Sequence, residues 1–308
     1  MYYFIVNQNS RCGRGEKIWR KLERRMENYG REYEVKRTRA PGDAARFALE
    51  LTEDASEPRV IVAVGGDGTI NEVLNGISLD GKAVLGYIPT GSGNDLARSL
   101  KLSKNPMKCL GRVLNPAYVR CLDYGILSYE NEEPVHRRFA VSSGIGLDAA
   151  VAHGLLASSG RKHILNRLLG RFRYLLIGIK HLILAKPVKG YVLLDGVKKV
   201  EFNHIYFVSA HIHPSEGGGF RFAPGAVCDD GRLEVCVVHN SSKRKLVSVL
   251  IDAYFGRMGH HRGVRFYSCK EVSIHLDRPM PVHTDGGSCL CQTDIHLRCV
   301  EKKLRMIM

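Results

Sequence analysis

Over the first hundred residues, short apolar runs alternate with segments in which apolar side chains recur at helical spacing. Such runs predict strands, and the helical spacing predicts helices. The run "RVIVAV" at 59–64 is mostly β-branched, which is typical of a strand buried on both faces of a parallel sheet. We expect strands at 1–7, 33–38, 59–64 and 83–88, and helices at 18–29, 44–51, 70–77 and 94–100. This alternation predicts a parallel, doubly wound α/β sheet.

The pattern changes near Arg120, where short alternating segments replace the succession of strands and helices. Asp195-Gly196 separates two of these segments, and this dipeptide is a strong hairpin signal. The expected strands lie at 121–127, 137–146, 190–202 (as a hairpin), 205–213, 231–239, 263–277 and 294–302. We therefore predict an α/β domain at 1–121 and an antiparallel, mostly β domain at 122–308, and leave open that the last residues pack back on the first domain.

One segment of the second half is helical in pattern and free of acidic residues. From Ala149 to Leu194 there is no Asp or Glu, while Arg and Lys alternate with Leu and Ile between 160 and 186. A basic, amphipathic segment of this kind favours peripheral contact with an anionic membrane surface. The alternative is a helical pair that packs on the core and turns its basic side chains to water. Nucleic acid is not expected here, because aromatic residues are not regularly interleaved for base stacking.

Composition narrows the partners further. The 308 residues carry a formal net charge of +15, which favours anionic partners such as nucleotide phosphates or anionic lipid. Solubility alone is the alternative reading of that charge. The nine cysteines are scattered without zinc-ribbon spacing, the N-terminus lacks the pattern of a signal peptide, and no apolar run approaches a transmembrane length. We expect a cytoplasmic protein with free thiols that meets a membrane only from the side.

The segment "VIVAVGGDGTINEVLNG" at 60–76 carries the strongest chemical signal. A buried strand leads into Gly65-Gly66-Asp67-Gly68-Thr69 and then into a helix. Glycines let the backbone approach phosphate oxygens, and a helix N-terminus favours the same anion. Thr69 can donate its hydroxyl to a phosphate, whereas Asp67 suits a metal ion or a hydroxyl that loses its proton. A glycine-rich turn alone is weak evidence for a phosphate site, because such turns often only connect two elements. The combination of the strand, the motif and the following Asn-Glu is more specific.

A second loop, "PTGSGNDLAR" at 89–98, follows the next strand of the same sheet. It offers the hydroxyls of Thr90 and Ser92, close approach at Gly91 and Gly93, and Asn94-Asp95 at a helix start. Sites in doubly wound sheets lie beyond the carboxyl ends of the strands. We therefore expect the two loops to lie side by side.

These two loops resemble the catalytic domain of the diacylglycerol kinase family, the bacterial lipid kinases related to sphingosine kinases. That family shows Gly-Gly-Asp-Gly-Thr with Asn-Glu, and later Pro-x-Gly-Thr-x-Asn-Asp-Phe-Ala, where this chain has Ser92 and Leu96. "NQNSRCGRG" is similar to the family's N-terminal nucleotide loop, with Gln8 in place of proline. The resemblance implies an ATP site formed by Asn9, Ser10, Thr38, Gly65, Gly66, Asp67, Gly68, Thr69, Asn71, Gly91, Ser92, Asn94 and Asp95.

The same resemblance covers most of the chain and implies the rest of the site. "EGGGFRFAPGAVCDDGRLEV" matches a region in which relatives bind Mg²⁺ through an Asp-Gly aspartate, here Asp230, with the Val227 and Arg232 carbonyls. The alternative interpretation is that these residues form a hairpin turn. The implied fold is an α/β domain followed by a β-sandwich, with the active site in the cleft between them. The implied reaction transfers the γ-phosphoryl group of ATP to a lipid hydroxyl, most simply that of diacylglycerol or a related lipid.

One motif departs from the family. "VHTDGGS" at 282–288 occupies the place of a family Asp-Gly-Glu whose glutamate is the proposed general base, and Gly287 stands at that glutamate's position. Asp67 and Asp285 are the expected catalytic substitutes, and His283 is a third that is more often structural. Three functions stay open: an active lipid kinase with a displaced base, a weak or inactive relative that senses nucleotide or lipid, and an NAD kinase. The second loop argues against the last.

Overall fold

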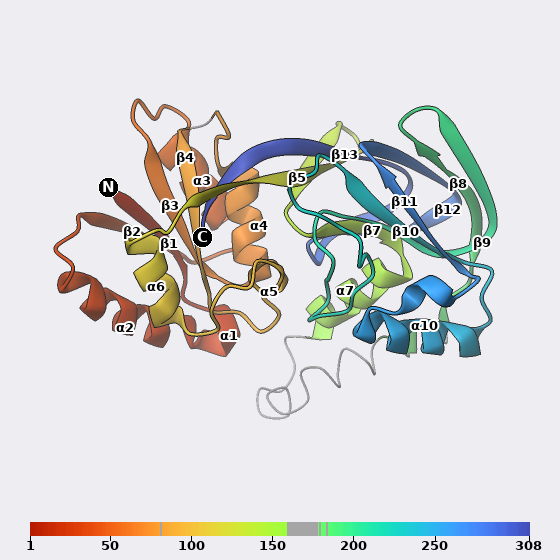
Figure 1. Cartoon of the computed structure of the whole chain (residues 1–308), viewed down its shortest axis with the longest axis horizontal. Coiled ribbons are helices and arrows are strands. Elements are labelled where there is room, and N and C mark those ends of the chain that lie inside the picture. Colours follow the sequence, from red (N-terminus) through yellow and green to blue (C-terminus); the bar gives the residue numbers. More distant parts are fainter. Residues whose placement is uncertain (81, 159–177, 179, 183) are drawn as a thin grey trace. The chain divides into compact units, whose positions relative to one another are not determined.

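The structure is a computed structural model that describes residues 1–80, 82–158, 178, 180–182 and 184–308 (Figure 1). The chain forms two compact units. Unit 1 comprises Met1–Asp123 and Lys302–Met308, and unit 2 comprises Tyr124–Glu301. The chain passes between the units within β5 and again within β13, so the last seven residues belong to unit 1.

Unit 1 is built on a parallel sheet, as the sequence predicts, and the structure gives its strand order as β4-β3-β1-β2. The end of β13 joins it beside β4, also in parallel, through the pair Met306 and Leu85. The sheet strands before β13 are β1 (Tyr2–Asn7), β2 (Tyr33–Thr38), β3 (Arg59–Gly65) and β4 (Ala83–Pro89).

Helices cover both faces of this sheet, because strand side chains alternate between the faces. On one face, Phe4 and Val6 pack with Trp19 of α2 and Leu110 of α6 in one buried cluster. On the other face α3 and α4 pack closely, since a Cβ at Gly76 would lie only 1.9 Å from the carbonyl oxygen of Ala45. The helices of unit 1 are α1 (Ser10–Gly13), α2 (Gly15–Glu27), α3 (Asp43–Thr52), α4 (Asp67–Gly76), α5 (Asp95–Ser99) and α6 (Pro106–Leu114).

Unit 2 is antiparallel, again as predicted. Its sheet runs β11-β10-β9-β7-β12-β13, with β8 paired to both β9 and β12 and β6 paired to β5. Asp195 and Gly196 take φ of 50° and 67° and make the predicted β8–β9 hairpin turn. The strands are β5 (Val119–Tyr129), β6 (Val135–Phe139), β7 (Ser142–Gly146), β8 (Val188–Leu194), β9 (Lys198–His211), β10 (Leu233–His239), β11 (Val264–Cys269), β12 (Glu271–Thr284) and β13 (Gly287–Ile307).

Helices pack on one face of the unit 2 sheet. Leu246 and Val249 of α10 share a buried cluster with Phe207 of β9 and Val238 of β10, and Met258 joins it from the short helix η1. Leu147 and the start of α7 belong to the same cluster. These elements are α7 (Leu147–Ser158), α10 (Lys243–Phe255) and η1 (Met258–His260).

Some boundaries differ from the sequence prediction. The segments 137–146 and 263–277 each split into two strands, between Phe139 and Ser142 and at Lys270. Helices α6 and α10 were not predicted from the sequence. Both helices begin at side-chain caps, where Asn105 accepts from the amide of Met107 and Ser242 from the amide of Lys245.

The basic segment 160–186 lies almost wholly outside the described residues, so its predicted membrane contact has no structural counterpart here. Within the part of the chain that the structure describes, no helix is both long and apolar enough to cross a bilayer.

Candidate active site

The carboxyl ends of four neighbouring parallel strands meet at one edge of the unit 1 sheet. Asn7 at the end of β1 pairs with Thr38 at the end of β2, and Gly65 at the end of β3 pairs with Pro89 at the end of β4. The loops that hold the predicted nucleotide residues all leave from this edge. The register therefore brings the loops together, in the position where doubly wound sheets bind ligands.

Side-chain hydrogen bonds tie three of these loops to one another. Asn7 Nδ2 donates to Thr69 Oγ1 over 2.9 Å, and the hydroxyls of Ser10 and Thr90 share a hydrogen bond of 2.8 Å. Ser10, Thr69 and Thr90 are all buried. Their hydroxyls hold the loops in place before any ligand is present.

The two glycine-rich motifs touch through their backbones. A Cβ at Gly91 would lie 2.5 Å from the Cα of Gly66, and the amide of Thr90 donates to the carbonyl of Gly65 over 2.7 Å. A Cβ at Gly65 would also collide with Thr69 Oγ1 at 2.3 Å. Glycine is required at both motifs for this close approach.

Asp67 joins the first motif to the second. Its carboxylate accepts from the amide of Asn94 over 2.6 Å and from the amide of Asp95 over 2.7 Å. Asn94 has a left-handed φ of 53°, and its side chain exchanges hydrogen bonds with the backbone of Gly91. Asp67 thus receives the two amides at the start of α5 and fixes the geometry of the second loop.

The other predicted nucleotide residues of unit 1 lie around this junction. Gly68 and Asn71 are in the first turns of α4, where Asn71 is buried, and Ser92 is in the loop between β4 and α5. Asn9 precedes α1, and its amide donates to Asn7 Oδ1 over 3.0 Å.

In unit 2, "VHTDGGS" forms a tight hairpin. β12 ends at Thr284, Asp285 and Gly286 turn with φ of 46° and 80°, and β13 begins at Gly287. Positive φ at both central residues is the geometry of a two-residue hairpin loop. The Asp285 carboxylate accepts from the amides of Ala140, Val141 and Ser142 over 2.8, 2.8 and 3.1 Å. Asp285 therefore anchors the segment between β6 and β7.

Beside this hairpin lies a buried cluster of ionisable side chains. His283 Nε2 is 3.3 Å from Asp148 Oδ2, and Ser142 Oγ donates to Glu216 Oε2. Burial raises the pKa of Glu216 to about 7, against the pull of the nearby His283 charge. Burial alone would lower the pKa of His283, but the hydrogen bond and charge of Asp148 raise it to about 9. At neutral pH the His283 imidazole is thus protonated, and the pKa of the neighbouring Glu216 carboxyl group is close to the pH.

An apolar pocket opens onto this cluster within unit 2. Among the described residues that line this pocket, Asp148 and Glu216 are the only acidic ones. The remaining lining is Leu147, Val151, Gly178, Phe207, Phe220, Phe222 and Leu250. The cavity is about 40 Å³ in volume, which is room for the end of an apolar group with a hydroxyl or similar polar group beside it. Glu216 was not predicted as a site residue, because "EGGG" has the local pattern of a turn and no neighbouring residue indicates burial.

The predicted magnesium residues occupy one turn that precedes β10. Asp230 Oδ1 accepts from the amide of Arg232 over 3.0 Å, and Val227 lies earlier in the same stretch and is half exposed. The Arg232 side chain is turned away to Ser268. A carboxylate and backbone carbonyls are hard oxygen donors, so the residues of this turn fit Mg²⁺ chemically.

Comparison with known proteins agrees with this architecture. A family model described as "Diacylglycerol kinase catalytic domain" matches residues 1–122. A second, described as "YegS C-terminal NAD kinase beta sandwich-like domain", matches residues 141–308, more than half of the chain. The fold and these matches define a two-domain member of a lipid kinase class of proteins. The chain belongs to the diacylglycerol kinase family.

Individual relatives are distant but cover nearly the whole chain. YtlR of Bacillus subtilis, provisionally named a lipid kinase, is 25% identical over 289 residues and covers 92% of each chain. A diacylglycerol kinase of the same strain is 26% identical over 278 residues, 88% of this chain and 86% of that one. The crystal structure of a diacylglycerol kinase from Bacillus anthracis has a TM-score of 0.72 at 20% identity, over 99% of this chain and 96% of that one, and supports the fold.

Proposed function

We propose that this chain transfers the γ-phosphoryl group of ATP to the hydroxyl of a membrane lipid, with diacylglycerol as the first substrate to test. The observation that carries the proposal is the unit 2 pocket, whose apolar walls end at the carboxyl groups of Asp148 and Glu216. Apolar walls favour the apolar part of a lipid next to its hydroxyl, and the hydroxyl fits a buried hydrogen-bond acceptor. Family membership independently favours a lipid acceptor.

On the donor side, the unit 1 loops hold the triphosphate. The amides at the N-terminus of α4 and the hydroxyls of Thr69 and Ser92 are the donors for its oxygens. Asp67 keeps the two glycine-rich loops in register. Mg²⁺ would be held by Asp230 with the Val227 and Arg232 carbonyls, where it supplies neutralisation of phosphate charge.

On the acceptor side, Glu216 takes the proton of the attacking hydroxyl. The lipid oxygen forms its bond to the γ-phosphorus as the bond to the β-phosphate bridge breaks, and the hydroxyl proton passes to Glu216 while ADP leaves. Gly287 supplies no carboxylate, and the oxygens of Asp285 already receive three backbone amides. Glu216, with a pKa near 7, is matched to this exchange at neutral pH.

Peripheral membrane contact belongs to the same proposal. A lipid acceptor lies in a bilayer, and a net charge of +15 attracts the chain to anionic lipid. The acid-free, basic segment at 160–186 supplies part of that charge.

The test is turnover of Mg²⁺-ATP by the purified full chain with mixed vesicles that contain diacylglycerol, sphingosine, ceramide or phosphatidylglycerol, and with NAD in a separate reaction. We expect a phosphorylated lipid and no phosphorylated NAD. Glu216→Gln should lower turnover by roughly 10²–10⁴-fold, whereas Glu201→Gln, an exposed carboxylate of β9, should not change it.

Gly287 favours one second candidate, a nucleotide- or lipid-binding sensor without turnover. Absence of product from every acceptor, together with measurable ATP binding, would reject the kinase proposal and leave the sensor. Product from NAD alone would reject both.

A further inference from the structure

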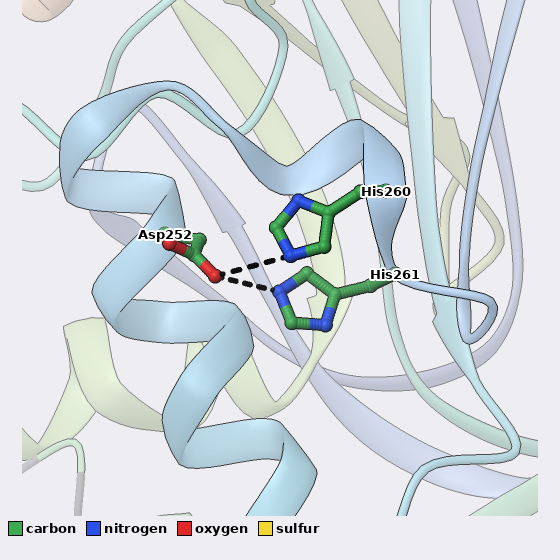
Figure 2. A group of neighbouring side chains, drawn as sticks. All are labelled: Asp252, His260 and His261. Carbon is green, nitrogen blue, oxygen red and sulfur yellow. Dashed lines mark hydrogen bonds and ion pairs between the residues drawn. The ribbon is translucent and has the colours of Figure 1, made fainter.

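Asp252, His260 and His261 bring three ligand atoms together on the surface of unit 2 (Figure 2). Asp252 Oδ2 lies 2.8 Å from His261 Nε2 and 3.5 Å from His260 Nε2, and all three atoms are within 4.8 Å of one another. Ligands of a tetrahedral zinc ion, with bonds of about 2.0–2.2 Å, stand about 3.3–3.6 Å apart. A small opening of the His261 contact would admit such an ion.

His260 is oriented so that a proton or a metal ion is needed between its Nε2 and the Asp252 carboxylate. Its Nδ1 lies 2.6 Å from the carbonyl oxygen of Arg257, which can only accept, so Nδ1 carries the hydrogen. In the neutral ring, Nε2 then turns a lone pair toward the carboxylate oxygen of Asp252. Two facing lone pairs repel unless a second proton or a metal ion stands between them. A carbonyl that holds the far nitrogen is the usual second contact of a metal-bound histidine.

The backbone holds the three residues rigidly. Asp252 is on α10, next to the buried Ala253, and Gly256 ends that helix with a left-handed φ of 70°. This cap turns the chain back, and Met258, which is fully buried, fixes η1 against the core. The ligands are therefore positioned before an ion arrives, which lowers the cost of binding.

Access and charge also suit an ion. The His260 side chain is 63% exposed, so solvent can supply the fourth ligand, whereas Asp252 and His261 are mostly covered at 17% and 13%. The Arg257 guanidinium approaches the other oxygen, Oδ1, at 3.9 Å and leaves Oδ2 to the histidines. Imidazole nitrogens select zinc or a similar transition metal over Mg²⁺.

We propose that Asp252, His260 and His261 form a surface site for Zn²⁺ or a similar divalent transition metal, which ties the end of α10 to η1. The site is separate in sequence from every residue assigned to phosphoryl transfer. A zinc ion here would act on the stability of unit 2.

The test is zinc titration of the metal-stripped full chain by calorimetry and thermal unfolding, in a background where the exposed Cys121 and Cys291 are changed to Ser. We expect one zinc per chain, a higher Tm with zinc, and an X-ray absorption spectrum with nitrogen and oxygen but no sulfur neighbours. His260→Gln should weaken binding at least about tenfold and remove the Tm shift. This variant is the safest for folding because His260 is exposed.

His275 provides the matched control. It also pairs with a carboxylate, at 2.6 Å from Asp294, but it belongs to neither group of three potential ligands found among the described residues. His275→Gln should bind zinc as the parent does. Failure of the parent to bind one zinc, sulfur in the zinc shell, or unchanged binding in His260→Gln would overturn the proposal.

Discussion

His283 Nε2 lies 3.3 Å from Asp148 Oδ2, and the two side chains are only 4% and 3% exposed. His283 is in β12, two residues before the hairpin turn, and Asp148 is in the first turn of α7. Removing a charge from water is costly, so a buried pair persists only where its partners and hydrogen bonds compensate. This pair ties α7 to β12 next to the carboxyl group of Glu216.

The first prediction concerns the pH dependence of stability. The folded pKa of His283, about 9, lies above its ordinary value of 6.5, so the folded state keeps a proton that the unfolded chain releases. This contribution is complete below pH 6.5 and is lost as pH rises through 9. It amounts to roughly 3 kcal/mol at most. The free energy of unfolding should therefore fall between pH 7 and 9, as urea titrations at each pH would measure.

His283→Gln should be less stable at pH 7 and should lack this fall. The neighbouring groups do not reproduce it: burial lowers the pKa of His211 to about 3, so that ring stays neutral, and Glu216 titrates lower, near 7. The exposed His275→Gln variant should keep the fall. A His283→Gln protein with the same pH dependence as the parent would contradict the pairing.

The second prediction concerns the pH dependence of turnover. Because the pKa of Glu216 is raised to about 7, the group is protonated below that pH and cannot accept a proton. With saturating Mg²⁺-ATP and diacylglycerol vesicles, kcat should rise about tenfold per pH unit below 7 and level off above it. Glu201→Gln should keep this profile. If Glu216→Gln keeps it too, the rise belongs to another group, such as the ATP phosphate.

The α/β half was accessible from the sequence because its signals are local. The β-branched run of β3 indicates a buried strand, and the glycines that follow it indicate a tight turn. In unit 2, the Asp195-Gly196 turn is a local signal of the same kind. The split of 137–146 into β6 and β7 has no local signal. It arises because the carboxylate of Asp285, more than 140 residues away, takes the amides of Ala140, Val141 and Ser142.

In the candidate site, too, the parts with local sequence signals were predicted and the parts formed by tertiary contacts were not. The phosphate loops are contiguous motifs, and the register of parallel strands predicts that they meet. The buried cluster combines Asp148 of α7, Glu216 of the loop that precedes β10, and His283 of β12. The burial of Glu216, and therefore its raised pKa, depends on tertiary structure. His283, which the sequence favours as structural, has a structural pairing to Asp148 and lies within this cluster.

The third prediction concerns Asp67. Asp67→Ala removes the acceptor for the amides of Asn94 and Asp95, so the second loop loses its fixed position. We expect a loss of nearly all turnover and weaker ATP binding, with a fall in the free energy of unfolding of about 0.5–2 kcal/mol, as for a lost helix cap. Calorimetric ATP binding, kinase assay and urea unfolding measure the three effects.

Asp80→Ala is the control for that variant. Asp80 also accepts a backbone amide, from Lys82, but it is exposed and lies outside the predicted motifs. It should retain turnover. Full activity of Asp67→Ala would show that the phosphate loops hold their geometry without this carboxylate and that the reaction centre lies elsewhere.

The last prediction restores the family's carboxylate at Gly287. A Cβ there would lie 3.2 Å from the carbonyl oxygen of Thr284 and 4.0 Å from the Arg137 guanidinium, so a glutamate fits after a small shift. Gly287→Glu should raise turnover in the parent and should rescue Glu216→Gln at least about tenfold, because either carboxylate can accept the hydroxyl proton. Gly287→Gln has the same size without a base and should rescue nothing. Equal effects of Glu and Gln would mean that the side chain acts by packing, and no rescue would mean that position 287 no longer reaches the attacking hydroxyl.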